Sequence, residues 1–276
     1  MKRLILNADD FGLTSGVNRA VIELHRAGML TSATMMARAA ASEEAIEMAR
    51  ATPTLAVGCH VVLVDGEPML PSSTLVDTRT GRFHPTLGAF LGPLLLGRIR
   101  ASEIEAEAAA QIALLQSRGV KLTHIDTHKH VHLFPTVLRP VLRAARSAGI
   151  CAVRNPFEPL WSRRATHGAG LVRRAEVCLL HWLEPVFRRI VAEEGFTTTD
   201  GALGVLATGS LNAATLESLL GNLPAGAWEL VTHPGYNDSD LARAHTRLRR
   251  SREAERTALA ALRLKEGIER IDFSRL

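Results

Sequence analysis

The sequence has few cysteines and no long apolar run. The three cysteines, Cys59, Cys151 and Cys178, lie far apart and are odd in number, which favours reduced thiols over a disulfide framework or a Cys-x-x-Cys zinc site. No apolar stretch approaches the roughly 20 residues that a transmembrane helix needs. We therefore expect neither a disulfide-stabilised domain nor a chain that crosses a bilayer.

Aromatic residues are also scarce, at 4% of the chain. The net charge is +5, but the basic residues are mostly arginines interleaved with acids, whereas a nucleic-acid-binding surface combines clustered basic residues with stacking aromatics. We expect no nucleic-acid partner. Only three apolar residues separate Lys2-Arg3 from Asn7, too few for the apolar core of a signal peptide, so we expect a cytoplasmic protein.

Short aliphatic runs alternate with longer amphipathic stretches, a pattern typical of parallel strands joined by helices. Strands are expected at residues 3–7, 31–36, 55–63, 121–126, 151–154, 203–206 and 229–232, and long helices at residues 102–118, 171–194 and 241–264. A length of 276 residues suits one barrel. The sequence thus predicts an α/β fold with a single (β/α) barrel-like domain over residues 1–276, a distorted TIM-like barrel of about seven strands.

Two segments exceed what this alternation requires. Residues 64–100 are turn-rich and long for a loop, which predicts an insertion that covers the site or contacts lipid. Residues 160–195 form a helical segment with Trp182 and Phe187 between arginine pairs, as in helices that rest on an anionic membrane. Core packing or a dimer interface accounts for either segment at least as well. Peripheral contact with the inner face of the cytoplasmic membrane and a homodimer therefore both stay open.

Polar residues gather at the ends of the expected strands, where β/α barrels carry their reactive groups. They are Asp9, Asp10, His60, the run from His124 to His132, Arg154 and His233. Each one alone is more typical of a solvated turn or a hydrogen-bonded core residue. Their common position at one rim favours a catalytic site.

The histidine run supplies one metal ligand rather than two. On an extended strand His124 and His128 face the same way but lie roughly 13 Å apart, too far to bind one ion together. His128 is nearer the strand end and is the expected ligand. Asp126 then orients a neighbouring ligand, and His130 and His132 are expected to bind substrate or support the ligands.

One carboxylate and two imidazoles leave coordination positions open for water and substrate, as in catalytic metal sites. Asp10, His60 and His128 are the predicted ligands of one divalent ion. Asp9 is the expected general base, and His233 the expected acid that protonates a departing amine. Asp9 and Asp10 can both serve only if the chain leaves the strand there. Two imidazoles favour Zn²⁺ or another transition metal over Mg²⁺.

Four motifs carry a family resemblance: Asn7-Ala8-Asp9-Asp10-Phe11-Gly12, Gly58-Cys59-His60, Thr123 to His132 with Pro135, and Thr232-His233-Pro234-Gly235. The chain resembles the YdjC/ChbG carbohydrate deacetylase family from the first residues to the last strand. The resemblance implies the same ligands, base and acid, and Mg²⁺ as the ion. In overall similarity the chain is most like the hopanoid biosynthesis-associated branch of that family, HpnK.

The sequence therefore predicts a metal-dependent hydrolase that removes the N-acetyl group from an N-acetylated amino sugar, specifically an N-acetylglucosaminyl hopanoid glycolipid. Three alternatives remain: a deacetylase of soluble chitooligosaccharides, a metal-dependent sugar isomerase, and a non-catalytic glycan- or lipid-binding module. Whether Arg154 binds substrate or holds an acid in place is also open at this stage.

Overall fold

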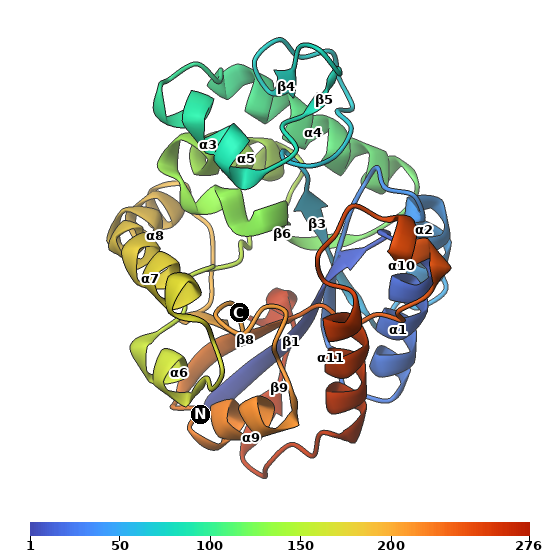
Figure 1. Cartoon of the computed structure of the whole chain (residues 1–276), viewed down its shortest axis with the longest axis vertical. Helices are drawn as coiled ribbons and strands as arrows, with labels where there is room; N and C mark the ends of the chain where they lie inside the picture. The colour runs from blue at the N-terminus through green and yellow to red at the C-terminus, as the bar shows by residue number, and fades with distance from the viewer.

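A curled sheet of seven parallel strands forms the centre of the computed structural model, which describes residues 1–276 (Figure 1). The strand order is β6 (Leu122–Thr127), β3 (Ala56–Val61), β2 (Ser32–Met35), β1 (Lys2–Phe11), β8 (Gly226–Thr232) and β7 (Gly201–Leu203), with β9 (Ile268–Arg270) paired to the start of β1. Helices surround the sheet. The predicted α/β barrel-like fold is confirmed.

The helices alternate with the strands along the chain. None of them is long and apolar enough to span a bilayer. They are α1 (Ser15–Arg26), α2 (Ser42–Arg50), α3 (Leu87–Leu95), α4 (Ala101–Ser117), α5 (Pro135–Ser147), α6 (Leu160–Ala165), α7 (Leu171–Leu180), α8 (Glu184–Glu193), α9 (Ala213–Gly221), α10 (Ser239–Arg243) and α11 (Arg250–Ala261). Three short 3₁₀ turns are η1 (His128–Leu133), η2 (His181–Leu183) and η3 (Phe273–Arg275).

Three expectations about the elements were wrong. Residues 151–154 form no strand; Val153 and Ala152 make only isolated bridges, to Ile125 and to Thr197. The helix expected over residues 171–194 is divided by η2, and Pro185 lies in the first turn of α8, where its missing N–H costs nothing. The last helix is likewise divided into α10 and α11, and β9 was not anticipated.

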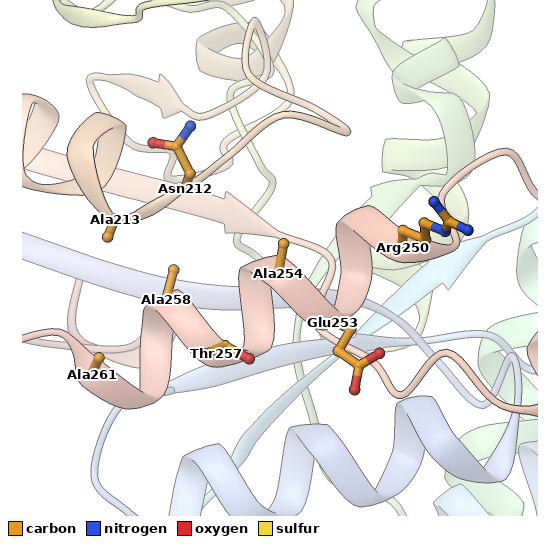
Figure 2. A pocket seen from close by; sticks show the side chains of 8 residues that line it. All are labelled: Asn212, Ala213, Arg250, Glu253, Ala254, Thr257, Ala258 and Ala261. Carbon is orange, nitrogen blue, oxygen red and sulfur yellow. The ribbon is translucent and has the colours of Figure 1, made fainter.

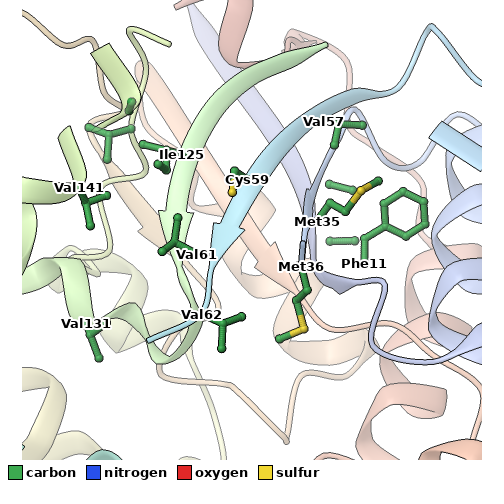
Figure 3. Packing of buried hydrophobic residues seen from close by; sticks show 14 of the residues in the cluster. Phe11, Met35, Met36, Val57, Cys59, Val61, Val62, Ile125, Val131 and Val141 are labelled. Carbon is green, nitrogen blue, oxygen red and sulfur yellow. The ribbon is translucent and has the colours of Figure 1, made fainter. Parts of the chain in front are cut away.

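Strand side chains alternate between an apolar outer face and a polar inner face. On β1, Leu4, Leu6 and Ala8 belong to the main core, whereas Asn7 and Asp9 lie on the other face, as period-two alternation requires. The same core takes in Val57, Cys59 and Val61 of β3, Ile125 of β6 and Val141 of α5 (Figure 3). The inner face is thereby left to residues that can do chemistry.

The segment of residues 64–100 contains the short antiparallel strands β4 (Val76–Asp77) and β5 (Arg82–Phe83), followed by α3. Carboxylates of α4 hold it in place: Glu103 accepts hydrogen bonds from the backbone and hydroxyl of Thr74, and Glu107 accepts from the amides of Met69 and Leu70. At its start Asp65 pairs with Lys129, 2.9 Å away. Because Lys129 follows His128, the segment begins beside the candidate site.

Candidate active site

Asp10, His60 and His128 come together at the carboxyl ends of three different strands. Asp10 Oδ1 lies 3.4 Å from His60 Nε2 and 3.2 Å from His128 Nδ1, and the two imidazole nitrogens are 3.3 Å apart. Ligands bound about 2.0–2.2 Å from one ion at tetrahedral or octahedral angles are themselves about 3.0–3.5 Å apart. The three atoms therefore have the spacing of ligands to a common divalent ion.

Unusual backbone conformations deliver these side chains. Asp10 has φ 63°, and the pairing register of β1 shifts between Ala8 and Phe11. The chain thus leaves the regular strand where Asp9 and Asp10 need it to, which lets both carboxylates point into the site. The other non-glycine residues with positive φ are Asp65, Lys129 and His130. All four lie around the site, where strained conformations are concentrated in enzymes.

The surroundings of His60 favour a positive charge at its Nε2. Its Nδ1 lies 2.8 Å from Asp126 Oδ1, so Asp126 fixes the ring, as carboxylates do for metal-bound histidines. Burial alone would lower the pKa of His60, but Asp126 and Asp10 raise it to about 10. Asp10 Oδ1 is buried without a hydrogen-bond donor. A divalent cation fits this position because it would supply the missing charge and the missing partner.

Arg154 is fully buried and connects three carboxylates. Its guanidinium donates to both oxygens of Asp9, at 2.6 and 2.8 Å, to Glu229 at 2.8 Å from Nε, and also pairs with Asp126. Burial by itself would raise the pKa of Asp9, but Arg154 and the neighbouring histidines hold it below its usual range. Arg154 therefore keeps Asp9 ionised and oriented.

His233 follows β8 and faces Asp9 from the other side of the site, with Nε2 3.7 Å from Asp9 Oδ2. Burial lowers the pKa of His233 to about 4, against the opposing effect of Asp9 and Asp10. The ring is therefore neutral near pH 7. Glu255 of α11 accepts a hydrogen bond from the backbone amide of His233, 2.7 Å away, and so fixes the peptide that carries the ring.

The remaining histidines of the run occupy different surroundings. His132 is buried, with Nδ1 2.7 Å from Thr127 Oγ1 and Nε2 3.2 Å from the carbonyl oxygen of Arg154, so it supports the backbone around Arg154. His130 is partly buried, and its Nδ1 has no partner. His124 stacks on Phe273 with ring centroids 3.7 Å apart and belongs to neither group of residues that could hold a metal ion.

Sequence reasoning missed Arg252 of α11, which is buried and donates to Asp10 Oδ2 over 2.5 Å. It leaves Asp10 Oδ1 to face the two imidazoles. No motif marked this residue or its neighbour Glu255, because both come from a helix late in the chain. The sequence shows only an arginine and a glutamate three positions apart. In a helix that is rich in charged residues, this pair does not stand out from its neighbours.

Replacing Arg252 by Lys should weaken the binding of a divalent cation by about 10- to 100-fold, the usual effect of losing a group that orients a metal ligand. The substitution keeps the charge but loses the forked donor that positions Asp10. Competition with a chromophoric chelator measures the affinity. Arg256→Lys on the same helix, where Arg256 contacts Tyr236 rather than the site, is the matched control. Equal affinities in the two variants would show that Arg252 does not position the ligand.

A separate cavity of 440 Å³ lies between α9 and α11 (Figure 2). It is lined by Asn212, Ala213, Arg250, Glu253, Ala254, Thr257, Ala258 and Ala261. None of these residues bonds to the groups described above, and the lining is dominated by small side chains without nucleophiles or ligand pairs. This cavity therefore lacks the cluster of carboxylates and imidazoles that is found at the strand ends.

A curled parallel sheet with carboxylates and imidazoles at its strand ends defines the chain as a barrel-like α/β protein with a candidate site for a divalent metal. More specifically, the model of the YdjC-like protein family matches residues 3–270. The chain belongs to the YdjC-like family.

Relatives and a solved structure agree with this membership. The chain is 29% identical over 268 residues to a carbohydrate deacetylase of Oceanobacillus iheyensis, covering 97% of this chain and all of that protein. A carbohydrate deacetylase of Brevibacillus brevis is 39% identical over 155 residues, or 56% of this chain and 60% of that protein. A crystal structure from Enterococcus faecalis V583, described as "a putative cellobiose-phosphate cleavage protein", has a TM-score of 0.76 at 27% identity, with 99% and 98% coverage.

Proposed function

We propose that this protein is a metal-dependent carbohydrate N-deacetylase. The observation that carries the proposal is the convergence of Asp10, His60 and His128 on one point, with Asp9 and His233 facing each other beside it. The naming of full-length relatives as carbohydrate deacetylases supports the reaction type. We assign the ligand role to the first three residues and the proton-transfer roles to the other two.

Asp9 and His233 provide a route for the proton that the reaction must move. A bound divalent ion would polarise the acetamide carbonyl and lower the pKa of water. Asp9, kept ionised by Arg154, accepts a proton as the water oxygen attacks the acetyl carbon. Because its pKa is low, Asp9 does not retain that proton. His233 is neutral at the outset, receives the proton, and delivers it to the sugar nitrogen as the C–N bond breaks and acetate departs.

The substrate that we propose is an N-acetylglucosaminyl hopanoid, in line with the resemblance to HpnK, and soluble chitooligosaccharides are the alternative. Residues 1–276 then act as one deacetylase domain, in which residues 64–100 cover the site. The tie between Asp65 and Lys129 supports this covering role, because it places the start of the segment next to His128. The ligand types favour Zn²⁺ or another transition metal as the ion, whereas the family resemblance favours Mg²⁺.

Acetate release from two substrates tests the proposal. The metal-loaded protein is incubated with N-acetylglucosaminyl hopanoid and, separately, with chitobiose carrying its N-acetyl groups, and acetate is measured enzymatically. We expect release from the glycolipid, and a reduction of about 10²- to 10⁴-fold in Asp9→Asn, which lacks the base.

Each rival has its own outcome. Release from chitobiose alone would remove the lipid-linked substrate, and no release with any ion would count against a deacetylase. A sugar product of unchanged mass without acetate would indicate an isomerase. A binding module predicts that Asp9→Asn alters neither ligand affinity nor any activity.

A further inference from the structure

Helix α7 presents its apolar face to solvent. The exposed apolar residues recur at helical spacing through α7 and η2: Leu171, Val172, Ala175, Cys178, Leu179 and Trp182. We call these six residues the α7 stripe. Leu171 is 85% exposed, Leu179 71% and Trp182 82%, whereas only Val177 of α7 is buried. Single exposed apolar residues are ordinary on proteins, but a continuous helical stripe marks a surface that is covered by a partner.

The arginines of the same helix face the protein. Arg174 donates to the carbonyl oxygens of Thr166, at 2.7 Å, and of Arg163 and Ala169, and Arg173 donates to that of Val205 at 3.1 Å. These bonds hold the helix in an orientation opposite to that of an ordinary surface helix, whose charged residues point outward. The outward position of the α7 stripe is therefore fixed by specific contacts.

The surroundings of the α7 stripe are basic. Residues 160–194 contain six arginines and four glutamates, a surplus of two positive charges. Arg173 and Arg174 are turned toward the protein, so the outward-facing arginines are those of α6 and α8. Arg164 is exposed and has no acidic partner, and the side chain of Arg189 is 67% exposed although it lies 3.8 Å from Glu193. In Figure 1 the helices α6, α7 and α8 lie together at one outer side of the molecule, so the apolar stripe and its basic flanks belong to the same region.

We propose that the α7 stripe docks onto an anionic lipid bilayer. Apolar side chains with an exposed tryptophan enter the boundary between headgroups and acyl chains, and flanking arginines meet the anionic headgroups. A second copy of this chain fits less well, because a symmetric contact would bring two surfaces of the same positive charge together. The inference rests on this surface and not on the proposed activity.

Co-sedimentation with vesicles tests the proposal. The wild-type protein should sediment with vesicles of phosphatidylglycerol and phosphatidylcholine, should do so much less with phosphatidylcholine alone, and should be released by high salt, which screens the arginines. The affinity of the double variant Leu171→Ser/Leu179→Ser for these vesicles should be at least about tenfold lower, because neither position then buries a leucine side chain in lipid. Leu70→Ser, which alters an exposed leucine outside the α7 stripe, should bind as the wild type does.

Trp182 supplies a spectroscopic signature of the same contact. Its emission should move to shorter wavelength when anionic vesicles are added, and Trp182→Phe should lose that shift while retaining most of the binding. Trp228 is buried, and the half-buried Trp161 packs against it with ring centroids 5.3 Å apart. The emission of these two residues is the background that Trp182→Phe measures directly. Equal midpoints of thermal unfolding establish that the variants are folded.

Two results would overturn the proposal. One is a wild-type protein that stays in the supernatant with both kinds of vesicle. The other is a dimer, measured by light scattering, that Leu171→Ser/Leu179→Ser converts to a monomer, which would assign the α7 stripe to a second copy. Hydrolysis of soluble chitobiose is measured separately, so that loss of lipid binding and absence of deacetylase activity are distinguished.

Discussion

Replacing Asp10 by Asn should abolish retention of a divalent cation and lower acetate release by at least about 10³-fold. The reason is that Asp10 is the only carboxylate of the three-ligand set, and loss of the ion removes several kcal/mol of charge stabilisation, at about 1.4 kcal/mol for each tenfold in rate. Asn is the right substitution because Asp10 has φ 63°, a conformation that Asn adopts more readily than Ala. Metal content after dialysis is measured by mass spectrometry beside acetate release.

The matched control for this change is Asp240→Asn, an exposed aspartate that pairs with Arg243; it should retain the ion and full activity. Wild-type protein stripped by a chelator and reloaded with Zn²⁺, Co²⁺ or Mg²⁺ in parallel identifies the ion that supports turnover. If Asp10→Asn retained one ion per chain and its activity, the cation would have to lie elsewhere.

Much of this arrangement could be predicted from the sequence, because parallel strands alternate in a simple way. Val57, Cys59 and Val61 on one face of β3 leave His60 on the other, and the paired register of His60 with Asp126 places both at one end of the barrel. Chain order and period-two alternation place Asp9 and His60 at one end of the barrel, whereas Asp10 and His128 join them through irregular backbone after β1 and β6.

The remainder depended on tertiary contacts that leave no local pattern. Arg252 and Glu255 reach the site from α11, and their role depends on how that helix packs against the end of β1 and the loop after β8. Residues 151–154 are apolar enough for a strand but make only isolated bridges to Ile125 and Thr197. The α7 stripe has ordinary helical spacing, and spacing alone does not tell whether such a face turns inward or outward.

Five buried carboxyl groups and two guanidinium groups surround the site: Asp9, Asp10, Asp126, Glu229 and Glu255, with Arg154 and Arg252. Counting every carboxyl as ionised and His60 as protonated, the charge before any cation is 3 − 5 = −2. Burial raises the pKa of Glu229 to about 7 and that of Glu255 to about 7, so protonation of these two relieves part of the excess. A divalent cation would relieve more, which makes the stability of the fold depend on the ion and on Arg154 together.

Replacing Arg154 by Met should therefore lower the free energy of unfolding by about 3–5 kcal/mol, the cost of leaving buried charges without their partner. Urea unfolding, with and without the ion, measures the effect, which should be smaller in the metal-loaded protein. Arg139→Met is the matched control, because Arg139 also bridges two acids, Glu193 and Glu194, but at the surface; it should cost about 0–1 kcal/mol.

A second substitution separates charge from packing. In Arg154→Met/Glu229→Gln one of the three carboxylates no longer needs compensation, so part of the lost stability should return, whereas a purely steric defect would be left unchanged. Arg154→Lys keeps the charge, but one ammonium group cannot reach three carboxylates. The stability of this variant should therefore lie between that of Arg154→Met and that of the wild type. Its acetate release should fall, because Asp9 loses its paired donors. Equal unfolding free energies for Arg154→Met and Arg139→Met would show that the buried carboxyl groups do not depend on Arg154.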